Sequence, residues 1–228
     1  MAKKKAKTKK RIFLVEDHAI LRECLKLFIG QEPDMEVCGE ASSAAEAFAA
    51  ISALRPDAVI TDISMPGMNG IEFLKNMKAL YPGIVAIVLS MHDEGVYAER
   101  ALRAGALGYI MKKDSTGEVI SALRKAFVGE THVSEKIVTS LMLRALDKKV
   151  PGKNGERTPV DILSDRELEV FEHLGRGSNT KSIATALGIS TKTVETHRMH
   201  IKEKLQVRSL SELIQQAAVW VDHITSGE

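Results

Sequence analysis

The sequence has few cysteines and no long apolar segment. Only two cysteines, Cys24 and Cys38, occur among 228 residues, and they form no Cys-x-x-Cys pair. A disulfide framework or a cysteine-bound zinc is therefore not expected, and the composition suits a reducing compartment. No window reaches the ~18 consecutive apolar residues that a membrane-spanning helix needs. The start, "MAKKKAKTKKR", lacks the apolar stretch of a secretory signal, so we expect a cytoplasmic protein with no membrane partner.

The net charge of +2 is unevenly distributed along the chain. The first eleven residues carry seven Lys/Arg and no acid, and the remainder holds 25 Lys/Arg against 30 Asp/Glu. Two interpretations of residues 1–11 stay open: a solvated, disordered tail, or a tail that adds sequence-independent attraction to phosphates. Neither "GRG" nor "GALG" completes Gly-x-Gly-x-x-Gly, so the sequence gives no support for a dinucleotide site.

Short apolar runs alternate with helix-period segments in the first half of the chain. Five candidate strands (residues 12–15, 35–41, 58–61, 84–90 and 108–111) alternate with five candidate helices (residues 21–30, 44–54, 71–80, 96–105 and 118–128). Strict alternation predicts an α/β domain with a doubly wound, five-stranded parallel sheet. Ser-x-x-Glu at Ser43 and Ser115 predicts capping boxes that open two of these helices.

From about Gly129 onward the pattern is helical. A Pro/Gly/charge-rich stretch, "DKKVPGKNGERTPVD", interrupts it and is typical of a linker. We therefore predict four regions: a basic tail at 1–11, the α/β domain at 12–130, a helical linker with a flexible segment at 131–160, and a small all-α, four-helix domain at 161–228.

Polar residues end several of the candidate strands. Glu16 and Asp17 follow the first strand, Asp62 the third, Ser90 ends the fourth, and Lys112 follows the fifth. Ligands bind outside the carboxyl ends of parallel strands where the strand order reverses. If the first and third strands are neighbours, three carboxylates converge, and a hard cation such as Mg²⁺ would relieve their repulsion.

Carboxylates beside Mg²⁺ can accept a phosphoryl group, because that transfer needs mainly positioning and charge neutralisation. Ser90 and Lys112 would then meet the new phosphoryl oxygens. Taken singly, each residue also has an ordinary structural explanation, since Asp62 can cap a helix and Lys112 can be solvated. The occurrence of all of them at successive strand ends favours the functional interpretation.

The motifs "VEDH", "VITDISMPGMNGIE", "VLS" and "GYIMKKD" occur in order, and residues 11–130 resemble the receiver domain of two-component response regulators. The resemblance implies that Asp62 is the phospho-acceptor, and that Mg²⁺ is bound by Asp17, Asp62 and the backbone carbonyl of Ser64, with Glu16 contributing through water. It also implies that Lys112 meets the phosphoryl group and that Ser90 and Tyr109 form a switch pair. Asn69 stands where Asp is more usual, and this difference is expected to matter little.

A phosphatase of the haloacid-dehalogenase type is an alternative for the aspartate nucleophile. Such enzymes place a second aspartate two residues later as the general acid, and Ser64 occupies that position. We therefore expect no enzymatic turnover, only slow loss of a phosphoryl group from the protein itself. Ser64 and His92 stand where such receivers tune the phosphoryl lifetime, and that lifetime stays open.

In "NTKSIATALGISTKTVETHRMHIKEKL" a short helix, a turn at Gly188 and a longer helix form a helix-turn-helix pattern. Val194, Ile201 and Leu205 share the face expected in the core. The opposite face is polar and can reach base edges or phosphates, and with the helix start and the preceding helix it gives eight candidate DNA contacts: Lys181, Ser190, Thr191, Lys192, Glu195, Thr196, Met199 and Lys202. An ordinary solvated amphipathic helix is the alternative.

Residues 163–218 resemble the LuxR-like output domain of NarL/FixJ-type regulators. Many members have Lys in place of Glu195, which removes one phosphate contact here and can favour a cytosine amino group. The family implies dimerisation through the last helix. A metal site at His197 and His200 is rejected, because no third ligand is evident.

Together these patterns predict that a sensor histidine kinase phosphorylates Asp62 and that the protein then binds double-stranded promoter DNA as a homodimer. The competing hypothesis is a phosphorylation-dependent interaction protein whose C-terminal helices bind another protein.

Overall fold

The computed structural model describes residues 8–147 and 158–226. The first seven residues of the predicted tail and part of the predicted linker lie outside the described residues. The chain divides into two compact units, one within residues 1–91 and 101–133 and the other within residues 92–100 and 134–228. Among the described residues, no helix is both long and apolar enough to cross a membrane.

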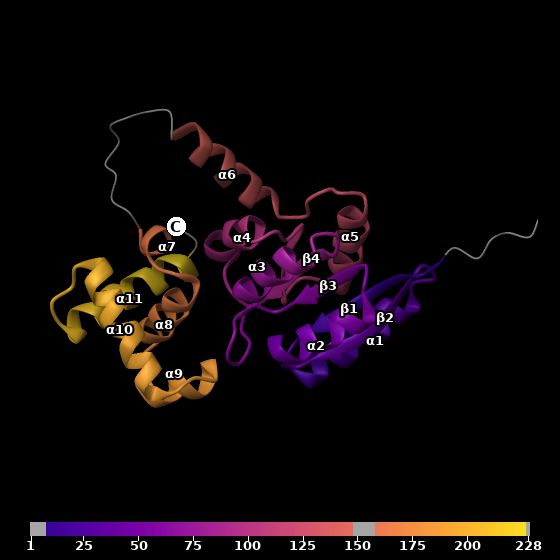
Figure 1. Ribbon diagram of the computed structural model, residues 1–228. Helices are drawn as coiled ribbons and strands as arrows, with labels where there is room; N and C mark the ends of the chain where they lie inside the picture. The colour runs from indigo at the N-terminus through magenta and orange to yellow at the C-terminus, as the bar shows by residue number, and fades with distance from the viewer. Residues whose placement is uncertain (1–7, 148–157, 227–228) are drawn as a thin grey trace, which may run out of the picture. The chain divides into compact units, whose positions relative to one another are not determined.

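A five-stranded parallel sheet forms the centre of the first unit (Figure 1). Its strands are β1 Lys10–Val15, β2 Met35–Ala41, β3 Ala58–Thr61, β4 Val85–Ser90 and β5 Gly108–Met111. Their order in the sheet is β2-β1-β3-β4-β5. The predicted doubly wound sheet is therefore confirmed, and the strand order reverses between β1 and β3.

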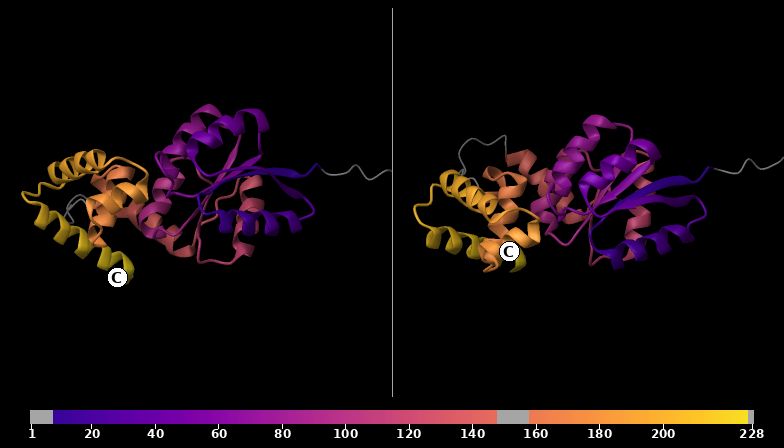
Figure 2. Two further views of the ribbon diagram at one scale, coloured as in Figure 1. Left: turned by 90° about the horizontal axis from the view of Figure 1, so that it is seen from below. Right: turned by 60° about the horizontal axis from the view of Figure 1, so that its bottom comes forward.

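Helices cover both faces of this sheet (Figure 2). They are α1 Ala19–Gln31, α2 Ala44–Leu54, α3 Gly70–Leu80 and α5 Thr116–Phe127. Helix α4 Glu94–Arg103 is divided between the units, because residues 92–100 belong to the second and residues 101–133 to the first. Alternate strand residues point to opposite faces, so Ile12 and Leu14 of β1 join one core with Leu25 of α1 and Leu123 of α5. Both faces of the sheet are buried, which explains why the strands are continuous apolar runs.

Strand β1 begins two residues earlier than the apolar pattern indicates. Lys10 and Arg11, the last two residues of the predicted tail, pair with Met35 and Glu36 of β2. Asp57 holds both: its carboxylate accepts a bond from the Arg11 backbone N–H at 2.8 Å and lies 3.4 Å from Lys10 Nζ. Backbone pairing with β2, together with the contacts to Asp57, therefore includes these two basic residues in the sheet.

The two predicted capping boxes of the first unit differ in outcome. Ser43 accepts a bond from the Glu46 backbone N–H at 3.4 Å and caps α2. Ser115 makes no side-chain cap bond, and Glu118 instead lies 3.0 Å from His132 Nε2. The Glu118 carboxylate therefore contacts a residue fourteen positions along the chain, and the expected capping box does not form.

In residues 134–147 and 158–226, the described part of the second unit that follows residues 92–100, the regular elements are all helices (Figure 1). They are α6 Glu135–Asp147, α7 Pro159–Ile162, α8 Asp165–Gly175, α9 Thr180–Leu187, α10 Thr191–Leu205 and α11 Leu210–Ser226. Helices α8 to α11 match the predicted four-helix domain, and the single turn α7 precedes them. Ser164 and Glu167 form a complete capping box at the start of α8.

Gly175, the last residue of α8, allows this helix to approach α11 closely. A Cβ atom at this position would lie 2.3 Å from the backbone oxygen of Ala217 in α11. Backbone atoms cannot move aside as a flexible side chain can, so a methyl group here would push the two helices apart.

We therefore expect Gly175→Ala to destabilise the C-terminal helices by about 1–3 kcal/mol. Amide hydrogen exchange should become faster in α8 and α11 and stay unchanged in α1 and α5. Gly30→Ala is the matched control, because a Cβ at Gly30 would meet no atom within 4 Å. Equal exchange in α8 and α11 for wild type and Gly175→Ala would contradict this account of the packing.

Candidate functional site

The reversal of strand order between β1 and β3 brings two acidic segments together. Val15 and Thr61, the last residues of these strands, are paired, and the Asp62 N–H donates to Val15 O at 2.9 Å. Glu16 and Asp62 therefore leave neighbouring strands at the same level of the sheet. This register turns two residues 46 positions apart into side-by-side carboxylates.

Four side chains at this edge form a cluster that can hold a metal ion. One ligand atom from each of Glu16, Asp17, His18 and Asp62 lies within 4.8 Å of all the others. Three of the four are carboxylates, the hard oxygen ligands that Mg²⁺ prefers. The donor set therefore fits a divalent cation of this kind.

The Lys112 ammonium group bridges two of these carboxylates. Its Nζ lies 2.7 Å from Asp62 Oδ2 and 2.8 Å from Glu16 Oε2, and all three side chains are at most 6% exposed. Burial raises the pKa of Glu16, the Asp62 charge raises it further, and Lys112 opposes both. Burial disfavours the ammonium form of Lys112, but the attraction of Asp62 and Glu16 outweighs it and raises the Lys112 pKa.

The loop after β3 fixes the direction of the Asp62 side chain. Asp62 Oδ1 accepts a bond from the Ile63 N–H at 2.6 Å, which leaves Oδ2 toward Lys112. The Gly70 N–H donates to Ile63 O at 2.8 Å, and a Cβ at Gly70 would lie 1.9 Å from Asp62 O. The side-chain oxygen of Asn69 caps α3 at the Glu72 N–H. An aspartate could serve as this cap equally well, which gives a physical reason for the expected tolerance of Asn69.

The remaining predicted residues of this site lie at or near the carboxyl ends of the strands. Ser90 ends β4, is fully buried, and accepts a bond from the Lys112 backbone N–H at 2.8 Å. Tyr109 lies within β5 opposite Val88 and is 3% exposed. Ser64 lies two residues after Asp62 in the loop that leads to α3. The structure thus brings Glu16, Asp17, Asp62 and Lys112 together, with Ser90 next to Lys112.

His18 belongs to the cluster, although the sequence argument did not include it. Its Nδ1 lies 2.8 Å from Asp17 Oδ1 and 3.0 Å from Glu16 Oε1. Its backbone N–H also donates to Glu16 Oε1 at 3.1 Å. The signal was available in the sequence, because His18 follows the acidic pair directly and a turn at a strand end brings such neighbours together.

We expect Lys112→Met to leave Glu16 and Asp62 as unpaired buried charges. In metal-free buffer the variant should lose about 3 kcal/mol of unfolding free energy. Mg²⁺ should then raise its melting temperature more than that of wild type, because the cation replaces the missing positive charge.

Lys113→Met is the control, since Lys113 is exposed beside the same strand. An equal response of wild type and Lys112→Met to Mg²⁺ in thermal unfolding would show that Lys112 does not balance the cluster.

A second candidate site lies on α9 and α10 of the C-terminal helices. Gly188 ends α9 with φ 61°, a left-handed conformation that favours glycine, and Ser190 then caps α10 by accepting a bond from the Thr193 N–H at 3.0 Å. Val194 and Ile201 are fully buried and Leu205 is partly buried, so the predicted core face is confirmed.

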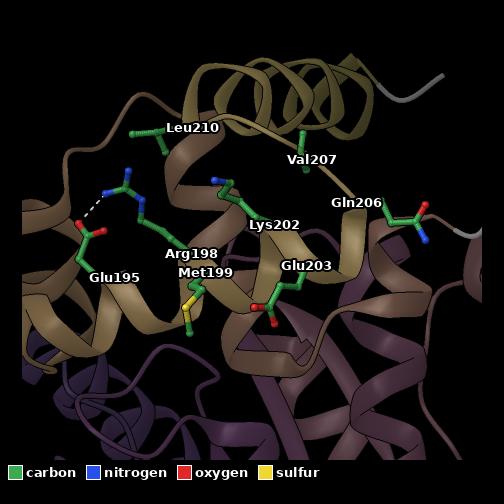
Figure 3. A pocket seen from close by; sticks show the side chains of 8 residues that line it. All are labelled: Glu195, Arg198, Met199, Lys202, Glu203, Gln206, Val207 and Leu210. Atoms are coloured by element: carbon green, nitrogen blue, oxygen red, sulfur yellow. Dashed lines mark hydrogen bonds and ion pairs between the residues drawn. The ribbon is translucent and has the colours of Figure 1, made fainter.

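The predicted DNA-contacting side chains lie on the open side of these helices. Seven are exposed, namely Lys181, Ser190, Thr191, Lys192, Glu195, Thr196 and Met199, and Lys202 is partly buried. The outer side of α10 borders a concavity of about 510 Å³ that continues to the start of α11 (Figure 3). Exposed lysine side chains and exposed hydroxyl and carboxylate acceptors thus lie together on the open side of α9 and α10.

Comparisons with known proteins match both units. Residues 12–124 match the model of the response regulator receiver domain, and residues 161–217 match that of the bacterial regulatory proteins of the luxR family. The oxygen regulatory protein NreC of Staphylococcus carnosus is 35% identical over 208 residues, which cover 91% of this chain and 96% of the relative.

Solved structures agree with these matches. A LuxR-family two-component response regulator from Aurantimonas sp. is 29% identical with a TM-score of 0.57, and covers 61% of this chain and 99% of that one. RcsB from Salmonella enterica, bound to promoter rprA with a phosphomimetic, is 22% identical with a TM-score of 0.61 over 92% of this chain and 99% of that one. The second likeness concerns the fold alone.

Proposed function

This chain belongs to the two-component response regulators that join a receiver domain to a LuxR-type DNA-binding domain, and on that premise we propose that Asp62 is its phospho-acceptor. A response regulator of this kind regulates transcription by binding DNA. The observation that carries the proposal for Asp62 is its carboxylate, held at the end of β3 against the Lys112 ammonium and beside Glu16.

The proposed phosphodonor is the phosphohistidine of a sensor histidine kinase. An Asp62 carboxylate oxygen attacks the phosphorus, the P–N bond breaks, and the kinase histidine keeps the electron pair and takes up a proton. Asp62 Oδ1 is held by the Ile63 N–H, so Oδ2 is the attacking atom. Lys112 must then move its ammonium from Oδ2 to the incoming phosphoryl oxygens.

Glu16, Asp17, Asp62 and the Ser64 backbone carbonyl are the proposed ligands of Mg²⁺. The bound cation would screen the negative charges of the carboxylates and the phosphoryl group from one another. Glu16 is almost fully buried, Asp17 is one-third exposed, and His18 flanks both. Glu16 would therefore hold the cation from the buried side of the cluster and Asp17 from the exposed side.

Ser90 and Tyr109 are the proposed switch pair. The Ser90 hydroxyl would move to the phosphoryl oxygens, and the aromatic ring of Tyr109 would take an inward position. Tyr109 already lies 3% exposed within β5, and the backbone bond from Lys112 to Ser90 ties the two strand ends together. The backbone bond between Lys112 and Ser90 supports the proposal that Ser90 responds when Lys112 moves.

The chain is proposed to act as a switch in the cytoplasm and not as an enzyme with turnover. Ser64 takes the position at which an aspartyl phosphatase would carry its general acid, and a hydroxyl cannot supply a proton as a carboxylic acid does. We also retain the predicted organisation as a proposal, with the first boundary moved to the start of β1 at Lys10: a basic tail before Lys10, a receiver domain from there to 130, a linker at 131–160 and the DNA-binding domain at 161–228.

Helix α10 is the proposed recognition helix in the major groove of promoter DNA. Lys181, Ser190, Thr191, Lys192 and Lys202 are assigned to phosphates, and Glu195, Thr196 and Met199 face the base edges. Dimerisation is proposed through α11, on which Leu210 and Ile214, four residues apart, are each 39% exposed and share one face. Two copies related by a twofold axis would match a palindromic operator.

Phosphorylation at Asp62 can be tested with a small acyl phosphate and Mg²⁺. Intact mass should show one added phosphoryl group on wild type and none on Asp62→Asn, because the amide is not a nucleophile at this position. Asp57→Asn is the control, since Asp57 precedes the same strand at its opposite end. A phosphoryl group on Asp62→Asn at the wild-type level would refute the assignment.

Lys192→Ala should weaken DNA binding uniformly across sequences, because the exposed Lys192 ammonium is assigned to a phosphate. The slope of log affinity against log salt should fall by about 1. Lys204→Ala is a matched control on the same helix, because Lys204 binds Glu167 at 2.6 Å. A loss confined to one base position would contradict the phosphate contact.

A further inference from the structure

Glu195, Arg198 and Thr180 form a closed triangle of hydrogen bonds between α9 and α10. Arg198 NH1 donates to Glu195 Oε1 at 2.6 Å and to Thr180 Oγ1 at 2.7 Å. The Thr180 hydroxyl in turn donates to Glu195 Oε1 at 3.0 Å. One oxygen of the carboxylate is therefore held by two donors from two helices.

The other carboxylate oxygen of Glu195 stays available for a ligand. The Glu195 side chain is 56% exposed, whereas that of Arg198 is only 13% exposed. Within the described part of the chain, no hydrogen bond reaches Glu195 Oε2, and Arg198 Nε is buried without a partner. Arg198 is thus directed at Glu195 and is largely shielded from solvent, and Figure 3 shows the two side chains joined by their ion pair.

We propose that Glu195 reads a cytosine in the operator and that Arg198 is the residue that positions it. This inference rests on the proposed entry of α10 into the major groove. A carboxylate offers acceptors only, so it is repelled by the acceptor groups of guanine and of thymine O4. Adenine offers an N6 amino donor, but its N7 acceptor lies beside that amino group. Cytosine presents the N4 amino donor without a neighbouring acceptor of its own.

Two effects oppose the binding of a carboxylate in a DNA groove, and Arg198 reduces both. A free glutamate is repelled by the phosphates, and the guanidinium partner offsets that charge. A free glutamate also loses rotamer freedom when it binds, and the triangle has already fixed the side chain. The contact to cytosine then needs little further ordering.

The placement of neighbouring side chains agrees with this assignment. Glu195 and Met199 are four residues apart on α10, and both line the concavity of about 510 Å³ with Lys202. Met199 is 52% exposed and offers an apolar surface one turn from the carboxylate. An acceptor, an apolar surface and a cation thus follow one another along the side of the helix that would face the groove.

The experiment is a selection of binding sites from random DNA with the full chain, Mg²⁺ and a small phosphodonor present. Wild type should enrich cytosine at one position of each half-site by about 5- to 150-fold over other bases. Glu195→Gln should lose that preference and favour adenine there, since an amide pairs with adenine N6 and N7. All other positions of the motif should be unchanged.

Two further variants separate positioning from folding. Arg198→Met should reduce the cytosine preference at the same position, and Arg198→Lys should restore part of it because an ammonium can still donate to Glu195. Glu203→Gln removes an exposed carboxylate from the same helix and should keep the wild-type motif. An unchanged cytosine preference in Glu195→Gln would overturn the inference while sequence-specific binding stands. Recovery of no motif by wild type, with and without the donor, would overturn the proposed function and the inference with it.

Discussion

The Lys112 ammonium between Glu16 and Asp62 is the interaction on which the receiver site depends. Without it, two buried carboxylates at the end of neighbouring strands would repel each other at the centre of the sheet. With it, the two negative charges are balanced, and the same ammonium group is the one that a phosphoryl oxygen would attract. The proposed chemistry at Asp62 would therefore have to rearrange the ion pair that balances the two buried carboxylates.

Strand order and side-chain alternation account for most of what the sequence could predict. The strands are continuous apolar runs because both faces are covered, and their carboxyl ends were marked by Glu16, Asp62 and Lys112. Placing those ends together needed only the assumption that the first and third strands are neighbours, and the observed order confirms it. The same logic succeeded on α10, where the period of a helix separates Val194 and Ile201 from the exposed face.

Side-chain pairs that are distant in sequence or irregular in spacing could not be predicted in this way. Lys10 and Arg11 were assigned to a tail by charge, but Asp57 draws them into β1. Glu118 had the spacing of a capping residue and instead pairs with His132. The hydrogen-bonded triangle of Glu195, Arg198 and Thr180 could not be predicted either, because it depends on how α9 packs against α10. Composition and period describe an element, whereas these contacts depend on how elements pack.

The central claim is that phosphorylation of Asp62 changes the affinity for promoter DNA. A coupling of about 1–3 kcal/mol between the two sites corresponds to a change of about 5- to 150-fold in binding. The direct measurement is a titration of one operator fragment with wild type and Asp62→Asn, each with and without a small phosphodonor in Mg²⁺. The account predicts a shift in the dissociation constant within that range for wild type and none for the variant. Identical responses of the two proteins to the donor would contradict it.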